Sequence, residues 1–564
     1  MKGKLDKRKI IHVIISALAA LSIIAVVYYV TLPPLNPYSK DFWSFVGFSA
    51  FIISVPITMI LASEIFWTPG YRKKKFGGNV KIDFKFGKAT KTAIFVSAGI
   101  PIAVIMIGSI FSSVFFNATS YAEIITVENG VFEEDMPETN SITNIALMDT
   151  PSAAVLGDRT LGNLSEMVSQ YELSSKYTQI NYQKRPQKIS NLEYADFFRW
   201  VNNRSRGIPG FVMVDPVNNT AEYKSLDTPI KYVDSAYFGE DLMRRLRFDY
   251  PTKIFNTVYF EIDEEGDPYF IVSCVKPQVG LFGAYDVSEV IIFNPCDGSS
   301  EIYPVSETPS WIDVVYVGDL ASQKYNWHGT YSGGFWNSVI SKIDCKQTTD
   351  DYGYIVIGDD VWYFTGVTSL GSDESNIGFI ISNARTGEYK FYSVVGAEEH
   401  SAMSAAQGEV QEKGYVASFP SLVNISGEAT YIMVLKDAYG LVKLYALVNV
   451  EQYNIVATGE TQKLAMDAYM KQLRENGIIG ATPDVPDDKT ESHNITVENV
   501  RMIEFGGEMT VYITAEDGKV YKALFESDES LILVRVGDKI NVKCTISDIE
   551  NIYSIISWEQ GNKQ

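Results

Sequence analysis

The sequence predicts an α+β membrane protein with three N-terminal transmembrane helices and a strand-rich extracytoplasmic region that ends in a small β-barrel. Three observations predict this fold class. Three long apolar runs lie within the first 120 of the 564 residues. The chain that follows breaks into short apolar runs bounded by Gly, Asn and Asp, which is typical of strands joined by tight turns. A segment rich in Pro, Gly and Asp, 477–493, then precedes a final group of about five alternating strands.

The apolar runs are 10–32, 43–65 and 94–116. Each is long enough to cross a hydrocarbon core of about 30 Å as a helix. The first run has no small-residue cleavage site at its far end, so we expect it to remain as an anchor and not to be removed as a signal peptide. The alternative is two spans plus one apolar helix buried in the folded region.

The distribution of Lys and Arg predicts the orientation. Residues 1–92 hold 14 Lys and Arg against 4 Asp and Glu, and the positive charges gather before the first run and after the second. Because such residues are retained on the cytoplasmic side, we expect the N-terminus in the cytoplasm. Three spans then place the chain from Asn117 onward outside the plasma membrane. Phe115 and Phe116 lie where aromatic anchors meet the membrane interface.

The rest of the chain is strongly acidic. Of the 48 basic and 69 acidic residues in the sequence, 34 and 65 lie beyond residue 92, a net charge of −31. This region repels nucleic acid, which is therefore not an expected partner. Acidity is typical of a soluble exported domain, and cation binding by acidic patches is the alternative. No metal or cofactor is predicted, because neither a CxxC zinc ribbon nor a calcium loop occurs.

The chain has four cysteines, all in the region expected outside, where an even count allows disulfides. Cys274 ends one apparent strand and Cys296 lies in the turn after the next, so these two form a possible disulfide. The alternative is four unpaired, buried thiols. His328 and His400 are the histidines that offer a general base, but neither lies in a recognisable hydrolase motif.

One hairpin pattern recurs along the acidic region. FVMVDPVNNTAEY begins at 211, EVIIFNPCDGSSEIY at 289 and GFIISNARTGEYKFY at 378, and a weaker copy begins at 446. In each of the first three, an apolar strand meets Asp215, Asn294 or Asn383 before a polar turn. Such side chains bond the backbone two residues on, so the pattern predicts tight turns.

The segments around two of these hairpins repeat in the same order. A helix-like segment at 238–255, and another at 397–414, each lead into a strand pair and then a hairpin. This order resembles the PepSY module. In that family, small exported or membrane-tethered units are linked with regulation of peptidases and with sensing outside the cell. The whole chain resembles membrane-anchored exported proteins of Gram-positive bacteria.

The expected organisation has five parts. They are a membrane domain (1–120), an α+β segment (121–235), PepSY-like α+β repeats (236–476), a linker (477–493) and a small barrel (494–564). The barrel is expected to be OB-like or SH3-like. From residue 495 on it holds 7 basic and 12 acidic residues, so a docking or capping role is favoured over nucleic-acid binding.

Half of the eight tryptophans fall between the two repeats, which is typical either of a core or of a carbohydrate or peptide cleft. The core is the favoured interpretation. If a cleft exists, the polar loop 368–376 is the part to examine, because polar loops on a rigid scaffold often carry function. The candidate binding residues are then Trp362, Asp373, Glu374 and Asn376.

These observations predict a membrane-anchored binding, sensor or scaffold protein of the cell envelope, with the bilayer and envelope proteins or peptidases as partners. No catalytic residue is assigned. The alternative is a cell-envelope hydrolase that acts on glycan or peptide through paired carboxylates, for which the acids are Asp359, Asp360, Asp373 and Glu374. A transport role is weaker, because it needs ionisable residues inside the spans, and only Glu64, at the end of a span, comes close to that.

Overall fold

The computed structural model describes residues 7–61, 87–139, 145, 147–370, 376–479, 491–505, 508–525, 529–546 and 551–560. The chain forms two compact units, Met1–Met466 and Asp467–Gln564. The first unit contains the apolar helices and a series of antiparallel sheets, and the second contains a barrel.

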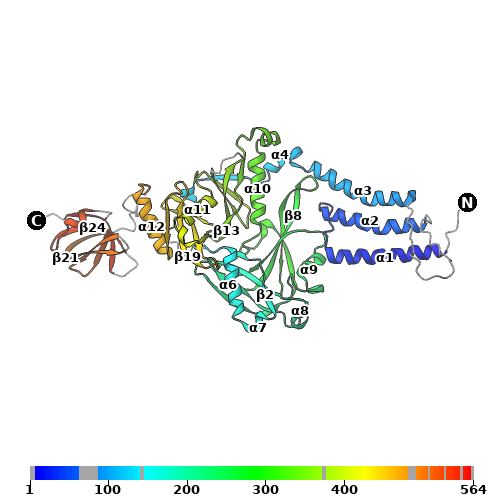
Figure 1. Ribbon diagram of the computed structural model, residues 1–564, viewed down its shortest axis with the longest axis horizontal. Helices are drawn as coiled ribbons and strands as arrows, with labels where there is room; N and C mark the ends of the chain where they lie inside the picture. The colour runs from blue at the N-terminus through cyan, green and yellow to red at the C-terminus, as the bar shows by residue number, and fades with distance from the viewer. Residues whose placement is uncertain are drawn as a thin grey trace. The chain divides into compact units, whose positions relative to one another are not determined.

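Among the described residues, three helices are long and apolar enough to cross a membrane, as the sequence predicts. Figure 1 shows them side by side, with α2 between α1 and α3. Protein covers only 6%, 17% and 11% of their most apolar windows, as expected of helices that face lipid. Their bounds are α1 (Lys7–Thr31), α2 (Lys40–Leu61) and α3 (Lys88–Phe111).

The described part of the first unit then holds four repeats, each a helix followed by an antiparallel meander. The leading helices are α6 (Thr150–Gly162), α9 (Leu242–Asp249), α10 (Gly318–Tyr331) and α11 (Glu399–Gly408). The first meander consists of β2 (Tyr171–Leu173), β3 (Thr178–Tyr182), β4 (Arg185–Tyr194), β5 (Ile208–Asp215) and β6 (Thr220–Ile230). The second consists of β7 (Ile254–Ile262), β8 (Pro268–Val279), β9 (Gly283–Phe293) and β10 (Ser300–Pro304).

The third and fourth meanders repeat the same order. Their strands are β11 (Lys346–Thr348), β12 (Gly353–Ile357), β13 (Asp360–Ser369), β14 (Gly378–Asn383), β15 (Tyr389–Tyr392), and β16 (Val416–Ala417), β17 (Ser421–Ile425), β18 (Glu428–Lys436), β19 (Val442–Asn449), β20 (Val456–Gly459). In three of these described sheets the first strand is split, because β2 and β3 both pair with β4, β11 and β12 with β13, and β16 and β17 with β18. A further strand, β1 (Val127–Gly130), adds to the third sheet parallel to β15.

The recurrent hairpin turns form as predicted. Oδ1 of Asp215 accepts from the backbone N–H of Val217 and Asn218, and Oδ1 of Asn383 accepts from Arg385 and Thr386, all at 2.8–2.9 Å. Asn294 and Asn449 accept one such bond each. Gly298 and Gly387 follow at φ of 79° and 75°, where a side chain would be strained. The weak fourth copy in the sequence also forms a turn, closed by the bond from the N–H of Gln452 to Oδ1 of Asn449 at 2.8 Å.

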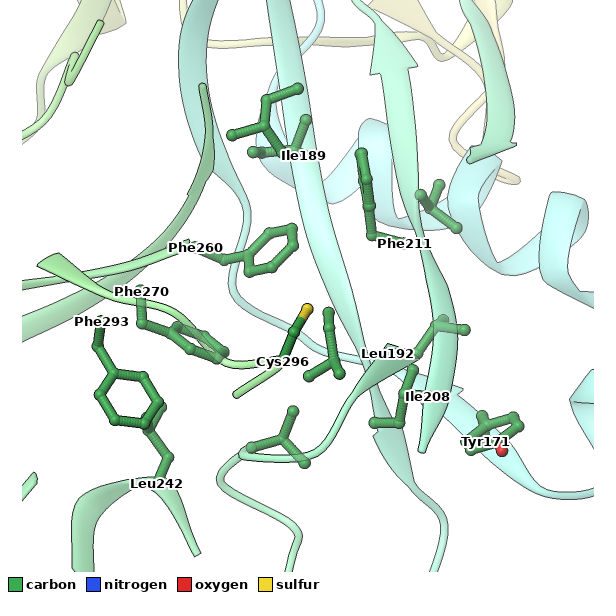
Figure 2. Close-up of a cluster of buried hydrophobic side chains, with 14 of the residues drawn as sticks. Tyr171, Ile189, Leu192, Ile208, Phe211, Leu242, Phe260, Phe270, Phe293 and Cys296 are labelled. Atoms are coloured by element: carbon green, nitrogen blue, oxygen red, sulfur yellow. The ribbon is translucent and has the colours of Figure 1, made fainter. Parts of the chain in front are cut away.

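Hydrophobic cores join the repeats in pairs. The first and second sheets share one core, in which the rings of Phe211 and Phe260 lie 5.6 Å apart and those of Phe260 and Phe270 lie 5.5 Å apart. Figure 2 shows these rings gathered with Phe293 and Cys296. The third and fourth sheets share a second core, where the ring of Phe379 lies 5.7 Å from that of Tyr431.

Polar contacts join these pairs into a closed ring. Between the second and third repeats, the N–H groups of Val315 and Tyr316 donate to the carbonyl of Ala384 at 2.9 and 2.8 Å. Between the fourth and first repeats, Lys436 pairs with Asp149 at 2.5 Å. Each repeat is thus bonded to the one before and the one after it, and the fourth is bonded back to the first.

The second repeat also holds the ends of the apolar helices. Arg247 Nε donates to the carbonyl of Leu32, just after α1, at 3.0 Å, and the N–H of Leu35 donates to the carbonyl of Pro251 at 2.7 Å. At the end of α3, Oγ of Ser112 accepts from the N–H groups of the β8–β9 turn. The loop after α1 and the end of α3 therefore both contact the second repeat.

The second unit contains the predicted barrel. Its described strands close in the order β21–β22–β23–β25–β24, with β23 and β25 parallel, around a core of its own that includes Ile513, Tyr521 and Val542. The strands are β21 (Glu491–Phe505), β22 (Glu508–Ala515), β23 (Val520–Leu524), β24 (Lys539–Ile546) and β25 (Ile552–Gln560). The remaining α-helices among the described residues are α4 (Val114–Ala122), α5 (Phe132–Asp135), α7 (Ser165–Val168), α8 (Phe197–Asn203) and α12 (Gln462–Glu475).

The disulfide considered from the sequence is not formed in this structure. Cys274 and Cys296 are free, buried thiols, as are Cys345 and Cys544. Burial raises the pKa of Cys274 to about 12 and that of Cys296 to about 11. Both sulfurs are packed with the apolar side chains of the first core, where they serve as small hydrophobic groups.

Candidate functional site

Of the four binding residues proposed from the sequence, the structure describes Trp362 and Asn376. Trp362 is 8% exposed and belongs to the core between the third and fourth sheets. Asn376 is fully buried at the Gly366 end of β13, away from Trp362. Asp373 and Glu374 lie outside the described residues. For Trp362, the interpretation as a core residue is therefore the right one.

A different site arises on the β3–β4 hairpin of the first repeat. Along these strands, Ile180 and Ile189 point into the core shared with the second sheet. Side chains alternate between the two faces of a strand, so the neighbouring Gln179 and Lys188 point to the opposite face. The two lie directly across from each other in the β3–β4 ladder, a placement that brings their Cβ atoms to about 5 Å.

Both side chains are buried by the third and fourth repeats. Gln179 is 3% exposed, and within the described part of the chain its Nε2 has no hydrogen-bond partner. Lys188 Nζ lies 3.4 Å from the hydroxyl of Thr150 and 5.1 Å from the centre of the Tyr354 ring. Burial lowers the pKa of Lys188 to about 8, although Asp149 opposes this shift. Two adjacent hydrogen-bond donors are thus held where few acceptors reach them.

These donors face two adjoining cavities of about 250 Å³ each, which share Gln179, Tyr354 and Ser421 in their walls. We call the pair the inter-repeat groove. One cavity is lined mainly by apolar side chains, and the other contains Lys188. The apolar wall is made by Met136, Pro137, Ile145, Ile355, Ile357, Leu422 and Val423.

Among the described residues, two strands of the groove each pair with one neighbouring strand along most of their length. β12 pairs with β13, and β17 pairs with β18. On its other side β17 forms a single parallel bridge, between Asn424 and Glu138. Backbone groups on such strands can pair with an added extended chain. The groove therefore combines apolar walls, two side-chain donors and strand edges.

The carboxylate nearest to Lys188 is already engaged. Asp149 caps α6 through the N–H of Ser152 at 3.0 Å and pairs with Lys436. Burial acts to raise the pKa of Asp149, but the bonds from Lys436 and Ser152 outweigh it and hold that pKa below its usual value. Asp149 is therefore committed to the joint between repeats, and the amine of Lys188 remains available to a ligand.

A buried pair of acidic residues, Glu261 and Asp313, holds the β3–β4 hairpin in position. The two carboxylate oxygens of Glu261 accept from the N–H groups of Asp313 and Val314 at 3.0 Å each, and Oδ2 of Asp313 accepts from the N–H of Asn181 at 2.7 Å. Burial raises the pKa of Asp313 to about 7, and burial together with Asp313 raises that of Glu261. Because Asn181 is on β3, this network positions the strand that carries Gln179.

Two other arrangements of reactive groups have structural explanations. Asp360 is bonded to Arg385 and to Nδ2 of Asn383, at 2.9 Å for the latter, so it fixes the third hairpin turn. In the barrel, Cys544 Sγ lies 3.7 Å from His493 Nδ1, but the residue is fully buried and its thiol pKa is raised to about 11, chiefly by burial. A thiol with so high a pKa is a poor nucleophile.

No set of three or more metal-ligating side chains gathers among the residues that the structure describes. The polar groups around Gln179 and Lys188 are the hydroxyls, phenols and carboxylates of Thr150, Ser421, Tyr352, Tyr354, Asp149 and Asp351. Among the groups of this cavity, the amide N–H of Gln179 and the amine of Lys188 are the donors suited to oxygen acceptors.

Sequence reasoning missed the groove residues for a physical reason. A lysine that alternates with isoleucine, as in Lys188-Ile189, is the usual pattern of a strand with one face in water. Only the packing of the third and fourth repeats onto that face buries Lys188. The available signal was weak, namely the polar–apolar alternation on both arms of 179–189, which predicts a hairpin but not its burial.

Comparisons with known proteins give little for this chain. No family model matches it, and no curated protein matches it. Among solved structures, one similar chain is an endo-arabinase from Bacteroides thetaiotaomicron, with 9% sequence identity and a TM-score of 0.16, covering 49% of this chain and 74% of that one. A likeness at this level carries no argument about fold or activity.

Proposed function

We propose that this protein is a membrane-anchored extracytoplasmic binding protein of the cell envelope, whose inter-repeat groove receives an extended peptide segment that carries a carboxylate. The observation that carries the proposal is the pair of buried donors, Gln179 and Lys188, on one face of a hairpin. A buried amide N–H without a partner costs free energy, about 1–3 kcal/mol. A ligand with acceptor oxygens removes that cost.

The rest of the groove supports a peptide as the ligand. Its apolar wall suits an apolar side chain. The strands β12 and β17, each paired with one strand among the described residues, suit a peptide backbone. The amine of Lys188 suits a carboxylate, either at a C-terminus or on an acidic side chain. From the sequence resemblance to PepSY modules we further propose a role in sensing or in regulating envelope peptidases.

The location outside the plasma membrane rests on two supports. The cluster of Lys and Arg near the N-terminus favours the cytoplasm for that end. The loop after α1 and the end of α3 both contact the second repeat, as Leu35 and Ser112 show, which is the arrangement expected if the repeats lie across the membrane from the N-terminus.

The barrel completes the proposed architecture as a docking module. Its strand order, with the third and fifth strands parallel, favours an OB-like barrel over an SH3-like one. Its excess of acidic residues disfavours nucleic acid as the partner, so an envelope protein is the proposed one.

The test compares two peptide libraries on the full chain in lipid nanodiscs. The probes are N-acetylated hexapeptides with a free C-terminal carboxylate and the same peptides with a C-terminal amide. We expect the chain to retain a subset of the acid library, and Lys188→Met to weaken that binding at least tenfold, which corresponds to about 1.4 kcal/mol. Lys176→Met, which removes an exposed lysine just before β3 that lines neither cavity of the groove, is the matched control and should bind as the unmodified chain does. Equal binding by Lys188→Met, or retention of neither library, contradicts the proposal.

A further inference from the structure

An exposed apolar loop, residues 336–343, projects from the third repeat and contains the short helix Asn337–Ser341. Four of its side chains face outward, with Trp336 64% exposed and Ile340 72% exposed, and Val339 and Ile343 more than half exposed. Contiguous exposed apolar side chains of this kind mark an interaction surface.

The loop has a fixed conformation. Nδ2 of Asn337 donates to the carbonyl of Ile343 at 2.8 Å, and Oδ1 of Asn337 accepts from the N–H of Ile343 at 3.2 Å. The N–H of Lys342, at φ 52°, donates to the carbonyl of Asn337 at 2.7 Å. The side chain of Asn337 thus joins the two ends of the loop, and the apolar side chains between them face outward.

The loop is continuous with the end of the third apolar helix. The ring of Phe115 lies 5.0 Å from that of Phe335 and 6.0 Å from that of Trp336. The ring of Phe116 lies 5.8 Å from that of Phe111, the last residue of α3. A chain of aromatic contacts therefore runs from the membrane-spanning helix to Trp336.

The β8–β9 turn also contacts the end of α3. A Cβ placed on Gly108, in the last turn of α3, would meet the ring of Phe282 at 2.6 Å and the side chain of Leu281 at 3.1 Å. The β8–β9 turn is therefore packed against α3 within its apolar span. This contact places the folded repeats against the end of the membrane span, where the bilayer surface lies.

We propose that the loop 336–343, together with Phe115 and Phe116, is inserted into the interfacial layer of the bilayer and gives the repeats a second membrane contact beside the helices. The occupant of this surface is lipid, because the loop continues the surface of a spanning helix and because Trp is enriched at that depth. Apolar side chains on a short segment lie in the interface in the same way in monotopic anchors. The inference rests on the membrane-anchoring part of the proposed function and not on the groove.

The test places a nitroxide on Ile340→Cys in the full chain, reconstituted in phosphatidylcholine vesicles. The four native cysteines are buried, and the parent chain gives the background. Collisions with oxygen, which concentrates in the bilayer, are compared with collisions with a neutral nickel chelate, which stays in water. Tyr439→Cys, in the β18–β19 turn and 80% exposed, is the matched aqueous reference. Ile107→Cys, on an exposed position of α3, is the lipid reference.

We expect the oxygen-to-nickel ratio at Ile340 to resemble that at Ile107 and to exceed that at Tyr439 several-fold. A ratio like that at Tyr439 overturns the proposal, and so does protection from both reagents, which would indicate a second protein copy on the loop. If Ile107 itself gives the aqueous ratio, the membrane anchoring fails, and this outcome is distinct from failure of the loop alone.

A second measurement avoids the cysteine variants. Brominated lipids quench tryptophan fluorescence at short range, so the chain should lose a quenchable component when Trp336 is replaced in Trp336→Phe. Trp362→Phe, at a buried position, should leave that component in place. Equal quenching of the unmodified chain and Trp336→Phe would contradict the proposal.

Discussion

At the scale of single residues, Lys188 sets the chemistry of the groove. It is buried, and the oxygen in hydrogen-bond contact with its amine is the neutral hydroxyl of Thr150. Burial without a bonded carboxylate disfavours the charged form. Lys188 therefore makes the groove suitable for an anionic ligand but destabilises the fold when no ligand is bound. This destabilisation depends on pH.

The sign of that signature follows from linkage. The pKa of Lys188 falls from 10.5 to about 8 on folding, so between these values the unfolded chain binds more protons and stability rises with pH. At 1.36 kcal/mol per unit of pKa, the shift at Lys188 lowers the free energy of unfolding by about 3 kcal/mol at pH values below 8. We predict that Lys188→Met is more stable than the unmodified chain at pH 7 and that this advantage shrinks toward zero near pH 10.5.

Thermal unfolding in nanodiscs at several pH values measures the effect. Lys184→Met serves as the control for removing a lysine from the same hairpin at an exposed position. A stability gap between Lys188→Met and the unmodified chain that stays constant from pH 7 to pH 10.5 would show that the amine is not held in the buried environment described.

At the scale of secondary-structure elements, α9 connects the second repeat to the end of α1. The Arg247 side chain is buried and donates to the carbonyls of Leu32, Tyr250 and Lys253 at 3.0, 3.3 and 2.5 Å. Its guanidinium also lies 4.1 Å from the centre of the Phe255 ring. One side chain thus satisfies three carbonyl groups at the joint between membrane and repeats.

We predict that Arg247→Met loosens this joint without unfolding the repeats. Leaving buried acceptors unsatisfied costs about 1–3 kcal/mol, which corresponds to roughly 10–100-fold faster hydrogen exchange at the Leu35 amide, the one bonded to Pro251. Exchange measured by mass spectrometry on the segment 32–39 checks this. Arg245→Gln, on the same helix and paired with Asp249 near the surface, should leave the exchange unchanged; unaltered exchange in Arg247→Met would refute the assignment.

At the scale of the whole molecule, the proposed orientation places the repeats outside the membrane and the basic loop inside it. The native cysteines are all buried, so an introduced surface cysteine can be labelled selectively. We predict that Tyr439→Cys reacts with a membrane-impermeant maleimide in intact cells. Lys74→Cys, in the basic loop after the second apolar run, should react only after permeabilisation. The opposite pattern would reverse the proposed orientation.

Part of the fold is predictable from the sequence because its signals are local. The helices α1 to α3 follow from unbroken apolar runs, and the turns at Asp215, Asn294 and Asn383 follow from side chains that bond their own backbone. The alternation of the last strands likewise predicts the barrel. Each of these depends on residues close together in the chain.

What the sequence by itself determined is therefore the membrane anchoring, the strand-rich region, its hairpin turns and the C-terminal barrel. Only the tertiary structure decided which polar side chains are buried and which aromatic side chains are exposed. Trp362 and Trp336 lie in the same tryptophan-rich segment between the two expected repeats, yet Trp362 is in a core and Trp336 faces outward. Lys188 has the pattern of a solvent-facing residue until distant repeats cover it. Burial is set by contacts between segments far apart in the chain, and no local pattern records those contacts.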